Sequence, residues 1–420
     1  MGQGAVIGVV TTSFPRHAAD PSGAFVLGLS LALAARGHRI EVVCPEPPEP
    51  ARWAKDEAWL AGIEVFGAPY ARPRRLERLF FGAGVPDNLA RSPWLRALVP
   101  GAVAGLAAMA ALRSRRWDAV MSHWLVPSSL VAGALSPAPE RHLAVAHSSD
   151  VHLLRSLPSG RWLAVAAMAR AGRVGFVSRR LLERTCELLG PRLAARMEKR
   201  FEVTPMGVDL AGLVPGRLRS VVRARMGLAR FAVLALGRLV PVKGMDVLVE
   251  ALAGRPGFEL VVAGDGPERA RLEVLCRKRG VTARFLGWVS PAERAELLHA
   301  CDAVALPSRP LPDGREEGLP LTAVETLAAG RPLVASITGA IPEIVTHGTN
   351  GLLVPPDDPA ALGQALETLR ADPALAVRLG FAGAKTGRAR SWERLADRYE
   401  ALLNIQRNPG GPATKTKTGE

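Results

Sequence analysis

Short apolar runs alternate with stretches of helical periodicity along most of the chain. Apolar runs bounded by turn residues predict buried strands, and the periodic stretches between them predict helices. Strands separated by helices indicate right-handed crossovers and a mostly parallel sheet. In the first half, the first helix is predicted over residues 24–36, and the strands over residues 5–10, 40–44, 63–66, 119–122, 143–146, 174–177 and 201–204.

A second alternation of the same kind starts near Phe231. Its strands are predicted over residues 231–237, 258–264, 284–287, 303–306 and 333–335, with a turn and strand in 349–355. Its helices are predicted over residues 245–254, 267–280, 291–301, 321–329 and 360–379. The whole pattern predicts an α/β chain of two Rossmann-like domains with parallel sheets facing across a ligand cleft.

The domain boundaries follow from the two alternations. Residues 1–205 are predicted to form the N-terminal domain and residues 206–390 the C-terminal domain. Residues 391–407 predict a last helix that packs back toward the N-terminal domain. Residues 408–420 are rich in Pro, Gly, Thr and Lys and predict a disordered tail.

The segment 71–116 departs from the alternation because it is both basic and apolar. One interpretation is a surface that docks on an anionic membrane, with Phe80, Phe81 and Trp94 at the level of the lipid head groups. The other is ordinary helices packed on the sheet with their Arg side chains in water. Its least polar part, residues 97–112, is shorter than the roughly 20 residues that span a bilayer.

Composition narrows the class of protein only partly. The chain has 420 residues and a formal net charge of +15, which favours acidic partners such as nucleic acid, anionic lipid or phosphate-bearing substrates. The sequence shows no aromatic-and-basic RNA motif and no helix-turn-helix signature, so we expect no nucleic-acid partner. Four widely spaced cysteines argue against a zinc site or a disulfide framework. With no signal peptide expected, we predict a cytoplasmic protein, with peripheral attachment to the inner membrane face as an option.

The stretch 301–336 contains the most informative candidate chemistry. A short predicted strand is followed by a loop rich in Pro, Gly and Asp, and a helix begins near Pro320. A helix N-terminus at the carboxyl edge of a parallel sheet is a natural anion site. Glu317 lies at the mouth of this unit and Glu325 about one turn into the helix. Carboxylates on both sides of an anion site suit a ligand with central phosphates and flanking hydroxyls, such as a nucleotide-sugar.

A second candidate segment follows the first strand of the C-terminal domain. Arg238 and Lys243 lie on the loop between this strand and the next helix, facing the same predicted crevice. The charge on a diphosphate leaving group grows as its bond to the sugar breaks. Fixed cations stabilise that charge without a metal ion, so we expect no metal cofactor.

These segments together resemble the family-4 retaining glycosyltransferases of the GT-B fold. The resemblance rests on GRLVPVKGMDVL, REEGLPLTAVETLAAGRPLVAS and TGAIPEIV, in family order and spacing. It implies that Glu317 binds the donor sugar, Glu325 binds the ribose, and Arg238 and Lys243 bind the diphosphate. It also implies backbone contacts from Gly318, Leu319 and Leu321 and a nucleobase pocket formed by Trp288 and Val289. Gly264 and Gly266 would form a glycine turn beside the nucleotide, and Gly237 would also bind the donor.

The N-terminal half resembles the family more loosely. Gly23 stands in the loop that approaches the donor phosphates, followed by Ala24 where the family has a second glycine. AHSSDVHLL resembles a strand end that places His147 and Asp150 near the reacting sugar. His123, which also ends a strand, is expected in the core or as a supporting neighbour rather than in the cleft.

The resemblance implies a retaining transfer from a nucleotide-diphosphate sugar, a UDP-sugar rather than a GDP-sugar, to a hydroxyl acceptor. His147, Arg238, Lys243 and Glu317 are the predicted catalytic residues. The N-terminal domain would bind the acceptor, a sugar or a lipid-linked sugar in surface polysaccharide or glycolipid synthesis. The alternatives are a non-catalytic nucleotide-sugar-binding or scaffold protein of this fold, and a phosphorylase or sugar-phosphate synthase.

Overall fold

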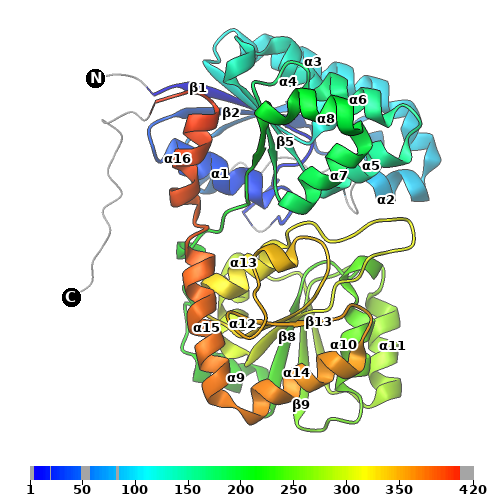
Figure 1. Ribbon diagram of the computed structural model, residues 1–420, viewed down its shortest axis with the longest axis vertical. Coiled ribbons are helices and arrows are strands. Elements are labelled where there is room, and N and C mark those ends of the chain that lie inside the picture. The colour runs from blue at the N-terminus through cyan, green and yellow to red at the C-terminus, as the bar shows by residue number, and fades with distance from the viewer. Residues whose placement is uncertain (1–3, 19, 49–56, 82–84, 407–420) are drawn as a thin grey trace. The chain divides into compact units, whose positions relative to one another are not determined.

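The computed structural model describes residues 4–18, 20–48, 57–81 and 85–406, so the tail predicted over 408–420 lies outside the described residues. The chain divides into two units. Unit 1 contains the residues up to Pro205 together with those from Trp392 onward, and unit 2 contains Met206–Ser391. In Figure 1, unit 1 runs from blue to green and includes the red helix α16, whereas unit 2 runs from green to orange.

Within the described residues, unit 1 is built on a seven-stranded parallel sheet in the order β3-β2-β1-β4-β5-β6-β7. The middle strands are buried on both faces, which explains their continuous apolar runs. All seven strands predicted from the sequence are present near their predicted bounds. They are β1 (Val6–Thr11), β2 (Arg39–Pro45), β3 (Glu64–Ala68), β4 (Ala119–His123), β5 (His142–Ala146), β6 (Arg173–Phe176) and β7 (Phe201–Val203).

Helices cover this sheet, and the last of them comes from the far end of the chain. Arg36 and His38 both contact Glu400 of that last helix, at 2.9 and 3.0 Å. The helices of unit 1 are α1 (Ala24–Ala34), α2 (Val85–Arg91), α3 (Val99–Ser114), α4 (Leu130–Leu135), α5 (Ser148–Ser156), α6 (Gly160–Met168), α7 (Arg179–Leu189), α8 (Pro191–Met197) and α16 (Trp392–Leu402). Short helical turns include η2 (Arg74–Leu76), η3 (Pro93–Leu98) and η4 (Leu125–Ser129).

The basic and apolar segment forms η2, α2, η3 and α3. Leu106 and Ala110 of α3 pack into a core cluster with Val10 and Val43 of the sheet. In the described part of the chain, one helical stretch, Pro93–Ser114, is long and apolar enough by length and composition to cross a membrane, and 22% of its window is buried. This helical stretch is longer than the least polar segment of the sequence, residues 97–112, because η3 continues directly into α3.

Unit 2, as far as it is described, contains a six-stranded parallel sheet in the order β10-β9-β8-β11-β12-β13. Its strands are β8 (Phe231–Leu236), β9 (Phe258–Ala263), β10 (Ala283–Gly287), β11 (Ala303–Leu306), β12 (Leu333–Ser336) and β13 (Leu352–Val354). Its helices are α9 (Arg219–Met226), α10 (Met245–Leu252), α11 (Arg269–Arg279), α12 (Pro291–Ala300), α13 (Leu321–Ala328), α14 (Pro359–Ala371) and α15 (Pro373–Arg388). Two parallel sheets in an α/β chain confirm the predicted fold class.

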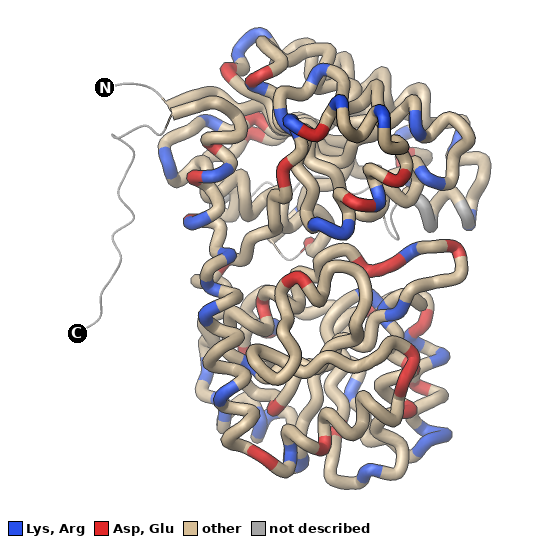
Figure 2. Tube along the Cα trace, viewed as in Figure 1, with Lys and Arg blue, Asp and Glu red and all other residues tan. Residues whose placement is uncertain are grey.

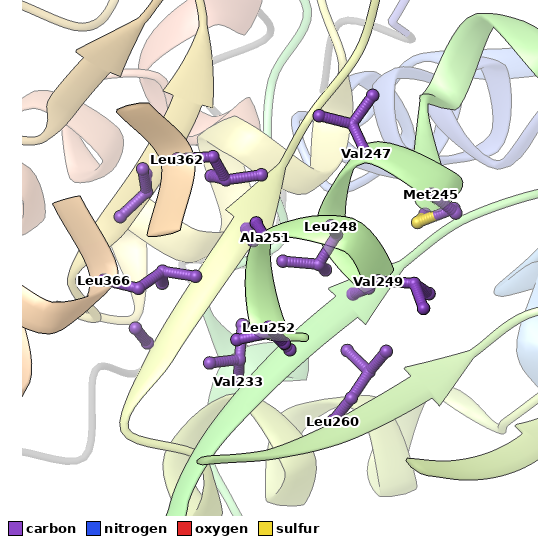
Figure 3. Packing of buried hydrophobic residues seen from close by; sticks show 14 of the residues in the cluster. Val233, Met245, Val247, Leu248, Val249, Ala251, Leu252, Leu260, Leu362 and Leu366 are labelled. Atoms are coloured by element: carbon purple, nitrogen blue, oxygen red, sulfur yellow. The ribbon is translucent and has the colours of Figure 1, made fainter. Parts of the chain in front are cut away.

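One face of the unit 2 sheet is covered by α10, α11 and α14. Figure 3 shows side chains of α10 packed against Val233 of β8 and Leu260 of β9. The same cluster includes Leu362 and Leu366 of α14. This core packs one face of β8 and β9, the strands from which the loops of the candidate site start.

The single helix predicted over 360–379 is wrong, because the structure has two helices there. α14 ends at Ala371, and α15 begins at Pro373 and continues to Arg388. Asp372 caps α15 by accepting a hydrogen bond from the backbone N–H of Leu375. Proline at the first helical position and a capping carboxylate before it both favour a new start.

Positive and negative side chains are interspersed over both units. Figure 2 shows Lys and Arg on many helices, with Asp and Glu close by along the same elements. Many arginines form ion pairs, for example Arg113 with Glu41 at 2.9 Å and Arg217 with Glu296 at 2.9 Å. These paired arginines are balanced by carboxylates, so the net charge of +15 comes from the excess of Lys and Arg over Asp and Glu.

Candidate functional site

The predicted cation and carboxylate of unit 2 lie in direct contact. Lys243 ends the short η8 turn (Pro241–Lys243) after β8, and Glu317 lies in the loop after β11. Lys243 Nζ lies 2.6 Å from Glu317 Oε2, with the two side chains 16% and 14% exposed. The hydroxyl of Ser308 donates to the same oxygen at 3.3 Å. β8 and β11 are neighbouring parallel strands, so their carboxyl ends bring these loops together.

Close backbone packing explains the glycines beside this pair. A Cβ on Gly264 would lie 1.9 Å from the carbonyl oxygen of Gly237, and a Cβ on Gly266 would lie 2.4 Å from that of Leu239. Gly264 has φ +144°, a conformation that L side chains rarely adopt. The loops after β8 and β9 therefore lie against each other with no side chain between them. Arg238 follows Gly237 on this surface.

The predicted nucleobase residues follow β10 at the edge of the same loops. The backbone N–H of Gly264 donates to the carbonyl of Gly287 at 2.7 Å, which brings the glycine turn next to Trp288. Trp288 is 53% exposed, whereas Val289 is half-buried against the core. An exposed indole beside a glycine turn provides a flat apolar surface of the kind on which a base can stack.

Gly339, which the sequence identified only as part of a motif, supports the Glu317 loop. A Cβ on Gly339 would lie 1.8 Å from the carbonyl oxygen of Glu317, and the backbone N–H of Ala340 donates to the carbonyl of Gly318 at 3.2 Å. The TGAIPEIV segment therefore fixes the loop before α13 through its backbone. Leu319 packs partly on the core, and Leu321 begins α13.

The second predicted carboxylate, Glu325, is buried in α13. Its Oε1 lies 3.0 Å from Nη1 of Arg294 on α12. Burial raises the pKa of Glu325, the charge of Arg294 lowers it, and the charge of Asp209 raises it. The net effect is a raised pKa, and Arg294 is the cation that opposes the effect of burial on Glu325.

In unit 1, the predicted His147 lies in an aromatic cluster. Its ring is 4.7 Å from the ring of Trp124 and 4.8 Å from that of Phe25, measured between centroids. Its Nε2 lies 3.2 Å from Nδ1 of His123. Burial lowers the pKa of His147 well below its usual value and that of His123 to about 3, so both rings are neutral near pH 7.

Trp124 holds an unusual backbone conformation in this cluster. Its φ is +70°, which is strained for a residue with a large side chain, and its indole N–H donates to the hydroxyl of Ser149 at 3.0 Å. The cluster lies at the carboxyl ends of β4 and β5, where ligands of parallel sheets bind. Phe25 of α1 belongs to the same cluster and follows Gly23, the N-cap residue of that helix. Gly23 has φ +68°, and a Cβ on Gly23 would lie 2.4 Å from the carbonyl oxygen of Ser13.

Asp150, predicted to contact the donor, is buried and bonded to its own unit. Its Oδ1 accepts from the backbone N–H groups of His147 and Val151, both at 2.9 Å, and its Oδ2 from that of Leu125 at 2.5 Å. Burial raises its pKa to about 7, against the lowering effect of these amides. The carboxylate therefore ties the end of β5 to the turn after β4.

The structure brings Lys243 and Glu317 into contact in unit 2, and in unit 1 it places His147 beside Phe25 and Asp150. Sequence reasoning missed Arg294 and left His123 as a core or supporting residue. The sequence could have pointed to Arg294, because this charged residue occupies a position in line with the buried Leu297, Leu298 and Cys301 at helical spacing. Among the residues that the structure describes, no group of three or more His, Cys, Asp or Glu could hold a metal ion.

Solved structures with this arrangement are GT-B glycosyltransferases. HepE from Anabaena, in complex with UDP and glucose, superimposes with a TM-score of 0.70 at 22% identity, covering 95% of this chain and 99% of that one. Sucrose-phosphate synthase from Thermosynechococcus elongatus gives a TM-score of 0.73 at 21% identity, with coverages of 95% and 98%. At these identities the likeness shows the fold. The fold is therefore that of the GT-B glycosyltransferases.

Family comparison adds the particular family within that class. Residues 227–386 match the profile described as Glycosyl transferases group 1, and residues 22–211 match the profile described as Glycosyltransferase Family 4. A glycogen synthase from Mycobacterium tuberculosis is 30% identical over 393 residues, covering 88% of this chain and 87% of the relative. The chain belongs to this glycosyltransferase family and is a sugar-transferring enzyme.

Other relatives differ in acceptor. A GDP-mannose-dependent monoacylated α-(1-6)-phosphatidylinositol monomannoside mannosyltransferase from Corynebacterium glutamicum is 29% identical over 306 residues, covering 70% of this chain and 78% of the relative. A similar mannosyltransferase from Mycolicibacterium smegmatis is 34% identical over 261 residues, covering 57% and 67%. The relatives therefore include enzymes named for a polysaccharide and enzymes named for a lipid.

Proposed function

We propose that this enzyme transfers a sugar with retention of configuration from a nucleoside diphosphate donor, a UDP-sugar, to a hydroxyl acceptor. The observation that carries the proposal is the contact of Lys243 with Glu317 at 2.6 Å, on the loops after β8 and β11. A cation and a hydroxyl-binding carboxylate on adjoining loops suit the phosphate and sugar ends of one ligand. The N-terminus of α13 adds free backbone N–H groups beside them.

The proposed reaction is a substitution on one face of the sugar. The bond between the anomeric carbon and the diphosphate oxygen breaks, and the acceptor oxygen bonds to the same face of that carbon. The acceptor proton passes to the departing diphosphate oxygen. Arg238 and Lys243 stabilise the negative charge on the diphosphate as it develops, and Glu317 holds hydroxyls of the sugar.

Nucleotide recognition is assigned to the remaining unit 2 residues. Glu325 accepts hydrogen bonds from the ribose, and Trp288 with Val289 contacts the base. The close glycine packing supports this assignment, because it brings the loops after β8 and β9 together without side chains between them. Gly237, Gly264, Gly266, Gly318, Leu319 and Leu321 supply the backbone that contacts the phosphates.

Unit 1 is assigned to the acceptor and to His147. Its neutral imidazole can exchange a hydrogen bond with a sugar or acceptor hydroxyl, and Trp124 with Phe25 provides an aromatic surface for a sugar ring. Asp150 acts by holding the start of α5 in place, as its three backbone partners suggest. Gly23 provides the close backbone approach at the start of α1.

No metal cofactor is proposed, because Arg238 and Lys243 provide the positive charge. Transfer should therefore persist in excess EDTA, and strict dependence on added Mg²⁺ or Mn²⁺ would contradict this part of the proposal. UDP-sugars are the proposed donors. GDP-mannose, the donor in the names of two relatives, is the competing donor in the same assay.

A peripheral position at the cytoplasmic membrane face, with a lipid-linked acceptor, completes the proposal. It is supported by exposed apolar side chains on η3 and α3, among them Trp94 at 51% and Leu112 at 75% exposure, close to several arginines. The protein should co-sediment with vesicles containing phosphatidylglycerol at low salt and be released at high salt. Absence of binding at low salt would remove the membrane part of the proposal.

The decisive experiment is a donor screen followed by product analysis. Wild-type protein is incubated with UDP-sugars and GDP-mannose, first by thermal shift and then with lipid and saccharide acceptors. We expect one donor to stabilise the protein, and NMR of the product to show the anomeric configuration of the donor. An inverted product would refute retention, and turnover without sugar transfer would refute the transferase assignment for the tested acceptors.

A further inference from the structure

One arginine of unit 2 contacts the predicted ribose carboxylate and has no assigned role. Arg294 lies on α12, in the first turn after the Ser290–Glu293 capping box. Its Nη1 lies 3.0 Å from Glu325 Oε1, and the two side chains are 36% and 10% exposed. Arg294 therefore reaches from a partly exposed helix surface to a nearly buried carboxylate.

The position of Arg294 on α12 would ordinarily be apolar. Leu297, Leu298 and Cys301 follow it at three-, four- and seven-residue spacing, and all three are buried in the unit 2 core. Nε of Arg294 is itself buried and has no hydrogen-bond partner among the described residues. An arginine whose Nε is desolvated without a partner is costly, so its contact with Glu325 has to offset that cost or serve the site.

Few charges reach Glu325. Arg294 is the nearest cation, and Asp209, on the segment that opens unit 2, contributes a second negative charge. The helix α15 packs on α13 through Gly383 and Gly387 and carries Lys385 and Arg388 in its last turn, and neither cation is among the charges that shift the pKa of Glu325. β12 adds only Leu, Val, Ala and Ser. With Arg294 removed, burial and Asp209 would both favour protonation of Glu325.

We propose that Arg294 is a positioning residue that keeps the Glu325 carboxylate ionised and oriented to accept hydrogen bonds from the two ribose hydroxyls of the donor. This inference rests on the proposed function, in which Glu325 binds the ribose. An ionised carboxylate can accept from both hydroxyls of a vicinal diol, whereas a protonated one loses an acceptor site and gains a competing donor. Arg294 contacts one oxygen through Nη1, which leaves lone pairs on Glu325 for the ligand.

The test compares nucleotides with and without the 2′-hydroxyl. UDP and 2′-deoxy-UDP, and GDP with 2′-deoxy-GDP, are titrated by calorimetry into wild type, Arg294→Met and Arg294→Lys at pH 6 and pH 8. For the base that wild type prefers, Arg294→Met should weaken binding of the ribonucleotide by about 10- to 100-fold at pH 6, the size of a lost hydrogen bond to a charged group. Binding of the deoxynucleotide should change by much less.

The pH dependence has a defined sign. In Arg294→Met, the cation that lowers the pKa of Glu325 is gone, so a larger share of Glu325 should be protonated at pH 6 than at pH 8, and ribonucleotide affinity should increase over that interval. Wild type and Arg294→Lys, which keep a cation beside Glu325, should show a smaller change over the same interval. A role in stability alone would weaken both nucleotides equally and would not create this difference between pH values.

A matched control distinguishes the site from general loss of charge. Arg279 on α11 pairs with Glu250 at 2.9 Å on a partly exposed surface, and Arg279→Met should bind both nucleotides as wild type does. Equal weakening of ribo- and deoxynucleotide by Arg294→Met, or no weakening, would overturn the inference and leave the proposed function intact. Failure of wild type to bind any of the four nucleotides would overturn both.

Discussion

The ion pair between Lys243 and Glu317 allows stability and catalysis to be measured separately in one pair of residues. Each side chain is mostly shielded from solvent, so removing one partner leaves a charge that is poorly hydrated. Lys243→Met leaves Glu317 with the hydroxyl of Ser308 at 3.3 Å as its remaining side-chain partner shown in the structure. We expect a loss of about 1–3 kcal/mol in the free energy of unfolding.

The catalytic effect should be larger than the stability effect. Removing one fixed charge from a developing oxyanion costs about 10²- to 10³-fold in rate, or roughly 2.7–4 kcal/mol of transition-state stabilisation. Lys243→Met should therefore reduce the rate of sugar transfer by that factor. The rate is measured at saturating donor, with the donor and acceptor found in the screen, and unfolding is followed by denaturant titration.

The double variant Lys243→Met/Glu317→Gln provides the sharper test. It removes both charges, so no unpaired charge remains, and the free energy of unfolding should return to within about 1 kcal/mol of wild type. The rate of transfer should stay as low as in the single variant or fall further, because both site groups are gone. The difference between recovered stability and unrecovered activity is specific to a functional pair.

Two results would refute this reasoning. Near-wild-type turnover in Lys243→Met would remove the lysine from the site, whatever its effect on stability. Recovery of activity together with stability in the double variant would make the pair a purely structural contact. Arg279→Met, which breaks a more exposed pair, serves as the reference and should change unfolding by no more than about 1 kcal/mol.

Three further predictions concern other parts of the molecule. Gly264→Ala should lower the free energy of unfolding by about 3 kcal/mol or more, since the new Cβ would meet the Gly237 carbonyl. Gly254 also has a positive φ but no atom within 4 Å of a Cβ, so Gly254→Ala should lower it by about 1–2 kcal/mol. Equal losses by denaturant titration would contradict the packing argument. Burial lowers the pKa of His142 to about 4, so only unfolded His142 binds a proton between pH 6.5 and 4, and stability should fall on acidification. His142→Gln should reduce that slope by about 1.4 kcal/mol per pH unit, and an unchanged slope would refute the assignment. His147→Ala should lower the transfer rate by about 10²-fold or more with donor affinity in unit 2 retained, and an unaffected rate would remove it from the site.

The strands and most helices could be predicted because parallel sheets leave a strong local signal. Strands buried on both faces read as continuous apolar runs, so all seven strands of unit 1 were found near their bounds. The error at residues 360–379 has a local cause, because an Ala- and Leu-rich stretch outweighed the start signal of Asp372 and Pro373. That signal was readable, since an N-cap carboxylate followed by proline is typical of a helix start.

Contacts that follow from the edge of one parallel sheet could be predicted from the sequence, whereas contacts that depend on how helices pack could not. Lys243 and Glu317 could be placed on adjoining loops because both follow strands of one parallel sheet, whose carboxyl ends meet at one edge. The contact of Arg294 with Glu325 depends on how α12 and α13 pack, which no local pattern specifies. His123 and His147 likewise meet because β4 and β5 are paired in register, with His123 beside Val145.

The last helix has a consequence for how this protein is made. Tyr399, Ala396 and Leu403, in and just after α16, are buried in unit 1, and a Cβ on Gly28 of α1 would lie 2.3 Å from the indole nitrogen of Trp392. During translation, unit 2 leaves the ribosome before these residues do. The nascent unit 1 therefore exposes the apolar side of α1 until α16 emerges. By then the described strands of unit 2 have all been made, and Val208 near its start can donate its backbone N–H to the carbonyl of Arg390 near its end.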